Sequence, residues 1–254
     1  MKFAEMTSPQ LAEVERDQTL VLIPIAAVEQ HGPHLPTATD TIICTAIAEK
    51  LEEILSEKIL LVPTLWLGAS AHHLRLGATV DCQLKNYMEL LPDIARSFLQ
   101  DGFQRVLFLN GHGGNIDPLK VALRQLQLKF PEALLTGGSY WTGASDLIHE
   151  MLEGDHKFVG HACEFETSMI MHLRSDLVQH DLITDAGELI PDEIEGFFVS
   201  RDMKQRTRQG CTGRPDLATA EKGKMLMEGI VNRLESTVKK LLRQKLGATY
   251  DDFC

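Results

Sequence analysis

The sequence predicts an α/β fold in which helices cover both faces of a mostly parallel sheet. Short apolar runs have the length and pattern of buried parallel strands, as in TLVLIPIA at residues 19–26. Segments with helical periodicity separate these runs, and strands that alternate with helices are typical of a parallel sheet. The 254 residues contain no internal repeat and no low-complexity linker, so we expect a single domain over residues 1–254.

The expected elements follow in order along the chain. Ser8 and Pro9 indicate the start of a helix that ends near residue 16, because serine caps helix N-termini and proline fits the first helical position. Further strands are expected at residues 59–63, 105–109 and 133–136. Further helices are expected at residues 40–56, 86–100, 115–129, 162–173 and 217–246. Residues 184–215 are the least regular stretch, and we expect loops there with a short hairpin.

Composition and charge disfavour several classes of function. The formal net charge of −11 argues against nucleic-acid binding, because an acidic surface repels phosphates. Five cysteines without a CxxC pair argue against a thiolate zinc site and a secreted disulfide framework, so reduced thiols are expected. The N-terminus lacks the apolar core of a signal peptide, and the longest apolar run, residues 20–28, is too short to cross a membrane. We therefore expect a cytoplasmic protein with no membrane partner.

A cluster of carboxylates and imidazoles follows the first expected strand. The segment EQHGPHLPTATD contains Glu29, His31, His34 and Asp40. In open α/β sheets, ligands bind in the crevice beyond the carboxyl ends of the strands. Imidazole and carboxylate together suit zinc, manganese or iron. The cluster therefore indicates a metal site, and a polar surface loop with incidental histidines is the alternative.

A second polar loop, NGHGGN, follows the third expected strand and carries His112. Its glycines permit positive φ and close approach of the backbone to a ligand, so Gly113 and Gly114 are candidates for substrate binding. Alone, the loop is equally compatible with a simple strand-to-helix turn. Two strand-end loops that both offer imidazole nevertheless indicate one shared site at the edge of a parallel sheet.

Two further segments carry candidate residues. In HACEFETS, His161 suits general acid–base catalysis, because the reference pKa of histidine is near neutrality. Glu164 and Glu166 point to different faces of the expected helix, so one of them is expected to face the site, although both are also compatible with helix-dipole stabilisation. In GASAHH, Ser70 or His73 is a weaker candidate for substrate contact.

These motifs resemble those of the creatininase (creatinine amidohydrolase) family. The matching segments are EQHGPHLPTATD, LNGHGGN, HACEFETS and GCTGRPDLATAEKG, which span residues 29–223. The resemblance implies a three-layer α/β/α fold and a centre with two divalent ions, with zinc expected and manganese or iron as alternatives. It also implies a homo-oligomer, a hexamer by analogy, that acts on a small-molecule amide.

The resemblance also implies individual roles. Glu29 and His112 would hold one ion, His31 the other, and Asp40 would bridge the two. His161 would be the catalytic imidazole. Metal-activated hydroxide would then hydrolyse a non-peptide C–N bond, in a cyclic amide such as creatinine or in a formamide, while His161 protonates the leaving nitrogen.

The sequence departs from creatininase itself at two places. Creatininase has a Tyr-Glu pair whose glutamate binds the second ion, where this chain has Gly113 and Gly114. Glu166 is the expected replacement, as a ligand and as a second catalytic group. Lys157 and Phe158 stand where creatininase has a Trp-Asp pair that packs on creatinine, so weak creatinine turnover is expected. Members with the Gly-Gly form include a deformylase that cleaves a formamide from a pyrimidine nucleotide.

Two functions of other classes remain open at this point. Cys163, where many relatives have glycine, suggests a cysteine hydrolase with His161, although the two residues are too close in sequence to form a natural pair. A metal-binding module without catalytic activity is the other alternative. Chelators would inactivate the metal enzyme, whereas thiol reagents would inactivate the cysteine enzyme.

Overall fold

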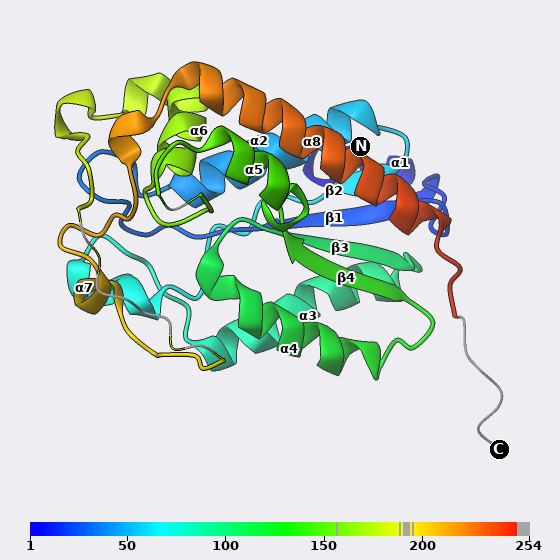
Figure 1. The fold of residues 1–254 in the computed structure, drawn as a ribbon. Coiled ribbons are helices and arrows are strands. Elements are labelled where there is room, and N and C mark those ends of the chain that lie inside the picture. Colours follow the sequence, from blue (N-terminus) through cyan, green and yellow to red (C-terminus); the bar gives the residue numbers. More distant parts are fainter. Residues whose placement is uncertain (156, 188, 190–193, 195, 248–254) are drawn as a thin grey trace.

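A four-stranded parallel sheet lies at the centre of the computed structural model, which describes residues 1–155, 157–187, 189, 194 and 196–247. The strand order is β2-β1-β3-β4, and Leu20 pairs in register with both Ile59 and Arg105. The strands are β1 (Leu20–Ile25), β2 (Ile59–Leu61), β3 (Arg105–Asn110) and β4 (Leu134–Ser139). The parallel sheet expected from the alternation of strands and helices is confirmed (Figure 1).

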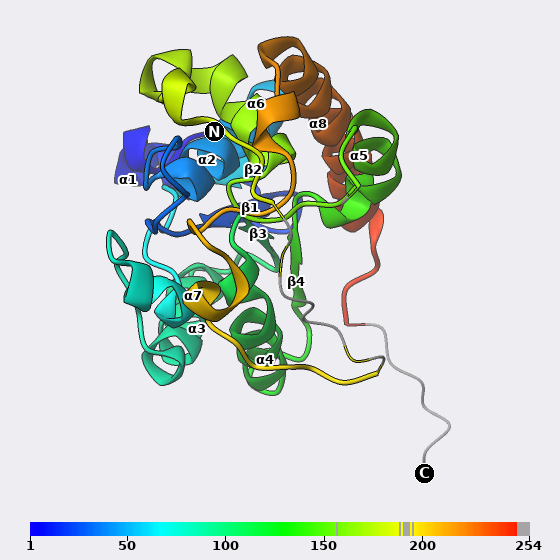
Figure 2. The same ribbon diagram turned by 60° about the vertical axis from the view of Figure 1, so that its left-hand side comes forward.

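Helices cover both faces of the sheet, as the two views in Figures 1 and 2 show. One face carries α2 (Thr39–Ile54), α5 (Ser145–Met151), α6 (Glu164–Arg174) and α8 (Ala220–Arg243). The other face carries α3 (Leu84–Gln100) and α4 (Ile116–Gln127). Two short helices, α1 (Ser8–Ala12) and α7 (Met203–Arg206), lie at the periphery. The predicted three-layer α/β/α architecture is confirmed.

The central strand β1 supplies side chains to two separate hydrophobic cores. Leu20 and Leu22 pack in the core beneath α2, α6 and α8. Val21 and Ile23 pack in the core against α3 and α4. Successive side chains of a strand point to opposite faces of the sheet, so a strand covered on both faces is apolar at every position. This explains why residues 20–25 form a continuous apolar run rather than an alternating one.

The observed elements differ from the expected ones in two helices. Helix α5 was not expected, because its seven residues are too few to show a clear apolar period. Helix α7 lies inside the region expected to be irregular, and its capping box at Asp202 and Gln205 explains its position. In the described part of residues 184–215, an isolated antiparallel bridge joins Ile194 and Phe197, and the rest of the expected hairpin lies outside the described residues.

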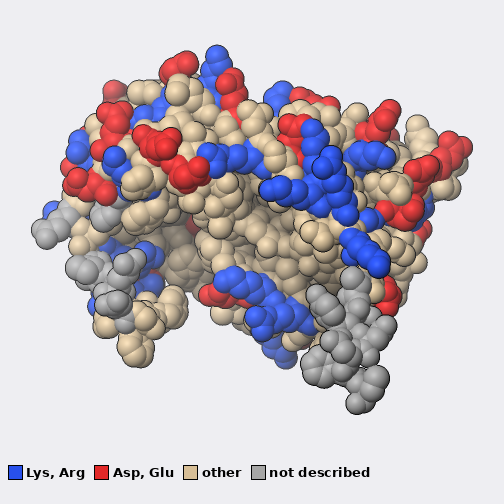
Figure 3. Space-filling model, turned by 45° about the vertical axis from the view of Figure 1, so that its right-hand side comes forward, with Lys and Arg blue, Asp and Glu red and all other residues tan. Residues whose placement is uncertain are grey.

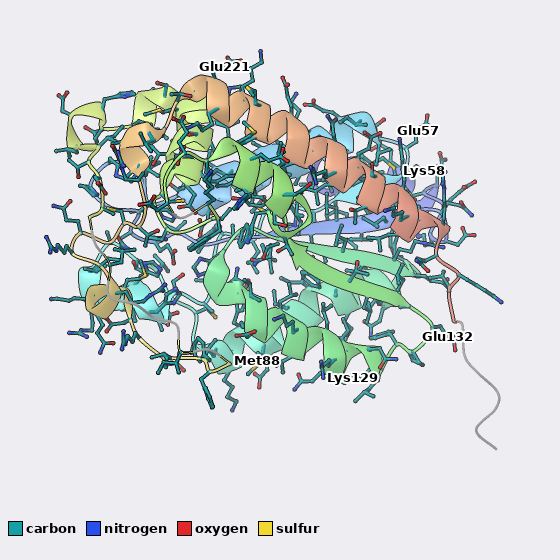
Figure 4. All side chains as sticks on the ribbon, in the orientation of Figure 1. Glu57, Lys58, Met88, Lys129, Glu132 and Glu221 are labelled. Atoms are coloured by element: carbon teal, nitrogen blue, oxygen red, sulfur yellow. The ribbon has the colours of Figure 1, made fainter. Side chains whose placement is uncertain are left out.

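The two ends of the sheet differ in character. Figure 4 labels Lys58, which directly precedes β2, and Lys129 and Glu132, which lie shortly before β4. All three lie near the amino ends of the strands and project outward. The carboxyl ends, by contrast, run into the loops that carry the histidine motifs.

Figure 3 shows one side of the molecule, where basic side chains flank an uncharged hollow. Among the described helices, none is long and apolar enough to span a lipid bilayer.

Candidate active site

Most of the predicted site residues converge on one cavity of about 910 Å³ beyond the carboxyl ends of β1 and β3. They come from the loops after β1 and β3, the 3₁₀ turn Ala71–Leu76, the first turns of α2 and α6, and the loop before α6. The predicted residues that line the cavity are Glu29, Asp40, His73, His112, Gly113, His161 and Glu166. His31 lies behind this lining and is fully buried. The structure therefore brings most of the predicted residues together at the carboxyl edge of the sheet, and their roles stay a prediction.

Asp40 lies between two imidazoles. Its Oδ1 atom is 3.1 Å from Nε2 of His31, and its Oδ2 atom is 2.9 Å from Nδ1 of His112. The carboxylate belongs to the first turn of α2, where the positive end of the helix dipole favours an anion. Each oxygen therefore faces a different potential metal ligand, an arrangement compatible with a carboxylate shared between two ions.

Glu29 is a buried carboxylate without a hydrogen bond from any described residue. Its Oε1 atom lies 3.3 Å from Nδ1 of His112, 3.3 Å from Nε2 of His73 and 3.6 Å from Nδ1 of His161, without hydrogen-bond geometry. Burying an anion without a hydrogen bond is costly, so a compensating positive charge is expected at this position, supplied by the imidazolium of His112 or by a metal ion. The arrangement is therefore compatible with a metal centre.

The two glutamates at the start of α6 have different partners. Glu166 has its Oε1 atom 3.9 Å from Nε2 of His31, and its Oε2 atom accepts the backbone N–H of Ala162. Glu164 borders the cavity, but its carboxylate is paired with Lys222. The backbone N–H groups of residues 153 and 154 also donate to Glu164, at 3.1 Å. Glu166 is therefore the glutamate that lies with the histidines.

Three groups of side chains place potential ligand atoms within 4.8 Å of one another. The groups are Glu29 with His72 and His112, His31 with Asp40 and Glu166, and Glu29 with His31 and His161. His72 was not among the predicted site residues. Its signal in the sequence was weak, because paired histidines are common on surfaces and nothing in GASAHH indicates which of the two turns inward.

The carboxylates and imidazoles strongly perturb one another. Burial lowers the pKa of His112, but Glu29 and Asp40 outweigh burial and raise it to about 10. The pKa of His31 is likewise raised well above its usual range, since Asp40 and Glu166 overcome the effect of burial. Burial opposes ionisation of Asp40, yet the two imidazoles hold its pKa well below the usual range. A divalent ion that binds these carboxylates and imidazoles would have to displace the imidazole protons, so protonation and metal binding compete.

His161 is held as a neutral imidazole. Its Nε2 atom lies 2.6 Å from the backbone carbonyl oxygen of Gln30, so Nε2 carries the proton and donates it. The Nδ1 lone pair then faces Oε1 of Glu29. Burial and the neighbouring His31 hold the pKa of His161 well below its usual range. A neutral imidazole with a free nitrogen directed into the cavity can accept a proton.

The expected substrate contacts fall into two groups. His73 and Gly113 line the cavity, and Gln30 donates to Nδ1 of His73 at 2.8 Å, so its Nε2–H points to Glu29. Ser70 and Gly114 are not among the residues that line the cavity. Ser70 is buried with its hydroxyl 3.3 Å from Nε2 of His112. Substrate contact by these residues stays a prediction.

Aromatic and basic side chains at the cavity were missed by sequence reasoning. Trp141 and Phe158 line it on one side, and Arg206 and Arg214 also border it. Trp141 and Arg206 lie outside every motif, and Arg214 lies in GCTGRPDLATAEKG without having been singled out. Phe158 was noted only as a departure from creatininase, and the tertiary fold brings all four to the cavity. His34, in contrast, belongs to a motif but braces α6, because its Nε2 atom lies 2.9 Å from Oγ1 of Thr167.

Cys163 does not have the environment of a nucleophile. The thiol is buried at the N-cap of α6, and burial together with Glu166 raises its pKa to about 12. Reactive thiols require a lowered pKa and a cationic neighbour. The four described cysteines form no disulfide, and Cys254 lies outside the described residues.

Comparison with known proteins gives consistent relationships. Residues 4–238 match the family model described as Creatininase: Creatinine amidohydrolase. The mycofactocin precursor peptide peptidase of Mycobacterium ulcerans is 30% identical over 228 residues, which are 87% of this chain and 84% of that protein. The creatinine amidohydrolase of Pseudomonas putida is 26% identical over 249 residues, 90% of this chain and 92% of that protein.

A solved structure gives the same fold. The structure titled Creatininase Mn superposes with a TM-score of 0.80 and 23% sequence identity, and covers 96% of this chain and 99% of that chain. At this level of identity the superposition establishes the three-layer fold.

Proposed function

Because the chain belongs to the creatininase family, we propose that it is a metal-dependent amidohydrolase that cleaves a C–N bond of a carboxamide or formamide. The observation that carries this proposal is the position of Asp40 between His31 and His112, with the unpartnered Glu29 beside them. Neutral amides are stable, and these residues would hold the divalent ions whose Lewis acidity promotes attack on an amide.

The residues fit a centre with two ions. Glu29 and His112 would hold one ion, His31 and Glu166 the other, and Asp40 would bridge them. Imidazole and carboxylate ligands suit Zn²⁺, and Mn²⁺ or iron is the alternative. When bound, the ions would acidify a water molecule and polarise the amide carbonyl. If Glu166 instead only braces α6, through the backbone N–H of Ala162, the second site would be weak and the two ions would be bound with unequal occupancy.

His161 would handle the proton during the reaction. Its Nδ1 atom, which faces Glu29, would accept a proton as water attacks and return that proton to the departing nitrogen. The carbonyl of Gln30 holds Nε2–H and thereby fixes the orientation of the ring. Without that hydrogen bond the imidazole could rotate, and Nδ1 would no longer be directed into the cavity.

The cavity favours a substrate larger than creatinine. A volume of about 910 Å³ lies near the upper end of the range for pockets that enclose drug-sized ligands. Trp141 and Phe158 offer aromatic surface to an apolar part of such a substrate. We therefore place a substituted small-molecule amide or a formamide first, and expect creatinine to be a poor substrate.

Cleavage of a short peptide is the second candidate. The cavity is large enough for several residues, and the relative that is 30% identical is named a peptide peptidase. In this candidate the cleaved bond is a peptide bond, while the proposed metal centre and the role of His161 in proton transfer stay the same. The sequence-based expectation of a non-peptide bond therefore stays a prediction.

The test is metal analysis followed by a hydrolysis screen with the metal found. Creatinine, N-formyl compounds and short peptides form the panel, with and without a chelator. We expect hydrolysis of at least one amide that the chelator abolishes. Creatinine turnover should stay below about 10 per second, the median for enzymes. Metal-free protein with undiminished hydrolase activity would contradict the proposal.

A further inference from the structure

His72 stands beside one half of the proposed centre without a partner of its own. It lies in the 3₁₀ turn Ala71–Leu76, is half-buried, and borders the cavity. Its ring stacks on that of His112, with centroids 5.7 Å apart and an angle of 20°. No described residue hydrogen-bonds to its ring nitrogens, yet one of them lies within 4.8 Å of ligand atoms of both Glu29 and His112.

Gly114 makes room for this arrangement. A Cβ atom at position 114 would lie 2.8 Å from Cε1 of His72, 2.5 Å from Nε2 of His112 and 2.1 Å from the carbonyl oxygen of Ala69. Any side chain there would have to displace one of the two histidines or the backbone. The absence of a side chain at 114 and the presence of His72 beside His112 are therefore two parts of one local structure.

The loop that carries His72 is anchored before the turn begins. The side chain of Asn115 accepts from the backbone N–H of Ala69 at 3.0 Å and donates to the carbonyl of Ala26 at 3.1 Å. Asp81 accepts from the backbone N–H of Ser70 at 2.8 Å. These bonds join the loop to the ends of β1 and β3, so His72 is held at the same sheet edge as Glu29 and His112. A ligand needs such support to keep its position when no ion is bound.

We propose that His72 is a third protein ligand of the ion held by Glu29 and His112. The inference rests on the proposed metal-dependent function and adds a residue that the sequence motifs do not supply. With His72, that ion would have two imidazoles, one carboxylate and a share of Asp40, so contact with a substrate would require the five-coordinate state that catalytic zinc can adopt. Because His72 is half-buried, it also sits where an incoming substrate would meet the ion.

The test titrates Co²⁺ into the metal-free full-length chain and uses absorption and chelator competition as readouts. The wild type should bind two ions. His72→Ala should lower the affinity for one of the two ions by about 10- to 100-fold, the range for loss of a residue that supports a metal site. The double variant His72→Ala/Glu166→Gln should lose both. His180→Ala, at an exposed histidine outside the cavity, is the matched control and should leave both affinities unchanged.

A second variant detects contact with the ion directly. His72→Cys should either show a thiolate-to-cobalt charge-transfer band that is absent from the wild type and from His180→Cys, or bind only one ion. Two bound ions without the band in His72→Cys, or unchanged affinities in His72→Ala, would overturn the ligand assignment alone. Wild-type protein that binds no Co²⁺ would overturn the metal-dependent function and this ligand with it.

Discussion

The two halves of the proposed centre are built from different parts of the fold. The deep half consists of His31, Asp40 and Glu166, and all three side chains are buried. Its two carboxylates, Asp40 and Glu166, lie in the first turns of α2 and α6. The open half consists of Glu29, His72 and His112, which come from loops, and His72 is half-buried.

This difference suggests a division of roles. Helix N-termini hold carboxylates in fixed positions and favour their ionised form, so the deep half should bind its ion tightly and exchange it slowly. Loop-borne ligands at the edge of a cavity are more accessible to solvent and substrate. We therefore expect the ion of the open half to exchange faster and to be the one that contacts the substrate carbonyl.

Replacing the bridge should affect both halves at once. Asp40→Ala removes the carboxylate that lies between His31 and His112, so both proposed ions would lose a ligand. Hydrolysis should fall by about 10³-fold or more, because a metal ion supplies several kcal/mol of transition-state stabilisation. Elemental analysis and kinetics on the best amide of the screen provide the measurement.

The matched control for Asp40→Ala is Glu49→Ala, at an exposed side chain of the same helix. It should keep both ions and wild-type activity. Full metal content with unchanged activity in Asp40→Ala would remove Asp40 from the centre and the comparison of the two halves with it.

Removing Glu166 should separate the halves. In Glu166→Gln the deep half keeps His31 and Asp40 but loses a charged ligand. One ion should be lost and the other retained, with activity reduced by about 10²- to 10³-fold, as for loss of one preorganised electrostatic group. Two ions at wild-type affinity would show instead that Glu166 only braces α6 through the backbone N–H of Ala162.

Anchoring of α6 should affect stability rather than metal binding. The buried carboxylate of Glu164 pairs with Lys222 of α8, so Lys222→Met would leave it without its cation. Loss of one partner of a buried pair costs about 3 kcal/mol, so the unfolding midpoint in urea should fall. Metal stoichiometry should stay at the wild-type value.

The double variant Lys222→Met/Glu164→Gln tests this reading, because removal of both charges should recover part of the lost stability. If Lys222→Met remains folded but loses the ion of the deep half, the ion pair between Glu164 and Lys222 positions α6 for metal binding. Glu164 and Glu166 would then be coupled more closely than we propose.

All three residues of the deep half were candidates from the sequence, whereas the open half contains one residue, His72, that was not. His31 and Asp40 lie in one dense motif after an apolar strand, and such a motif carries its own signal. His72 could not be predicted, because its role depends on the space left by Gly114 and on a loop anchored by Asn115. These are tertiary relations between segments more than forty residues apart.

The elements of the fold were likewise predicted where the sequence carries a local signal and missed where tertiary packing determines them. Strands β1, β2 and β3 are buried along their whole length and form continuous apolar runs, so they were located from the sequence. The partly exposed strand β4 was expected at residues 133–136 and extends to Ser139, because its second half, TGGS, has no apolar signal. Helix α5 was missed, because its packing against α8 rather than its own periodicity determines it. Cavity residues such as Trp141 and Arg206 were missed for a related reason, since single side chains on separate elements leave no local pattern.

Metal binding should be linked to pH through the open half. In the metal-free protein the pKa of His112 is raised to about 10 by Glu29 and Asp40, against the effect of burial. Below that pH the imidazole holds a proton that an ion must displace. Affinity should therefore rise with pH and level off above about 10.

The sign for stability is opposite. The folded-state pKa of His112 exceeds the usual 6.5, so its contribution to metal-free stability is complete below that value and is lost as pH rises toward about 10. Calorimetric titration of Zn²⁺ in buffers of different ionisation enthalpy counts the released protons. Affinity that is independent of pH between 7 and 9 would show that His112 is not protonated in the metal-free site.

The smallest effect is expected from Cys163, which adjoins the deep half through Glu166. With a pKa of about 12, roughly one thiol in 10⁵ is ionised at neutral pH, too few for a nucleophile. Cys163→Ala should change activity by less than about threefold, since it removes only one buried sulfur atom. Iodoacetamide should leave the enzyme active under conditions in which a chelator abolishes activity. Cys82→Ala, at a half-buried cysteine that does not line the cavity, is the control. If Cys163→Ala instead lost activity while it kept both ions, the thiol would belong to the reaction, and a cysteine mechanism would replace the metal centre as the source of catalysis.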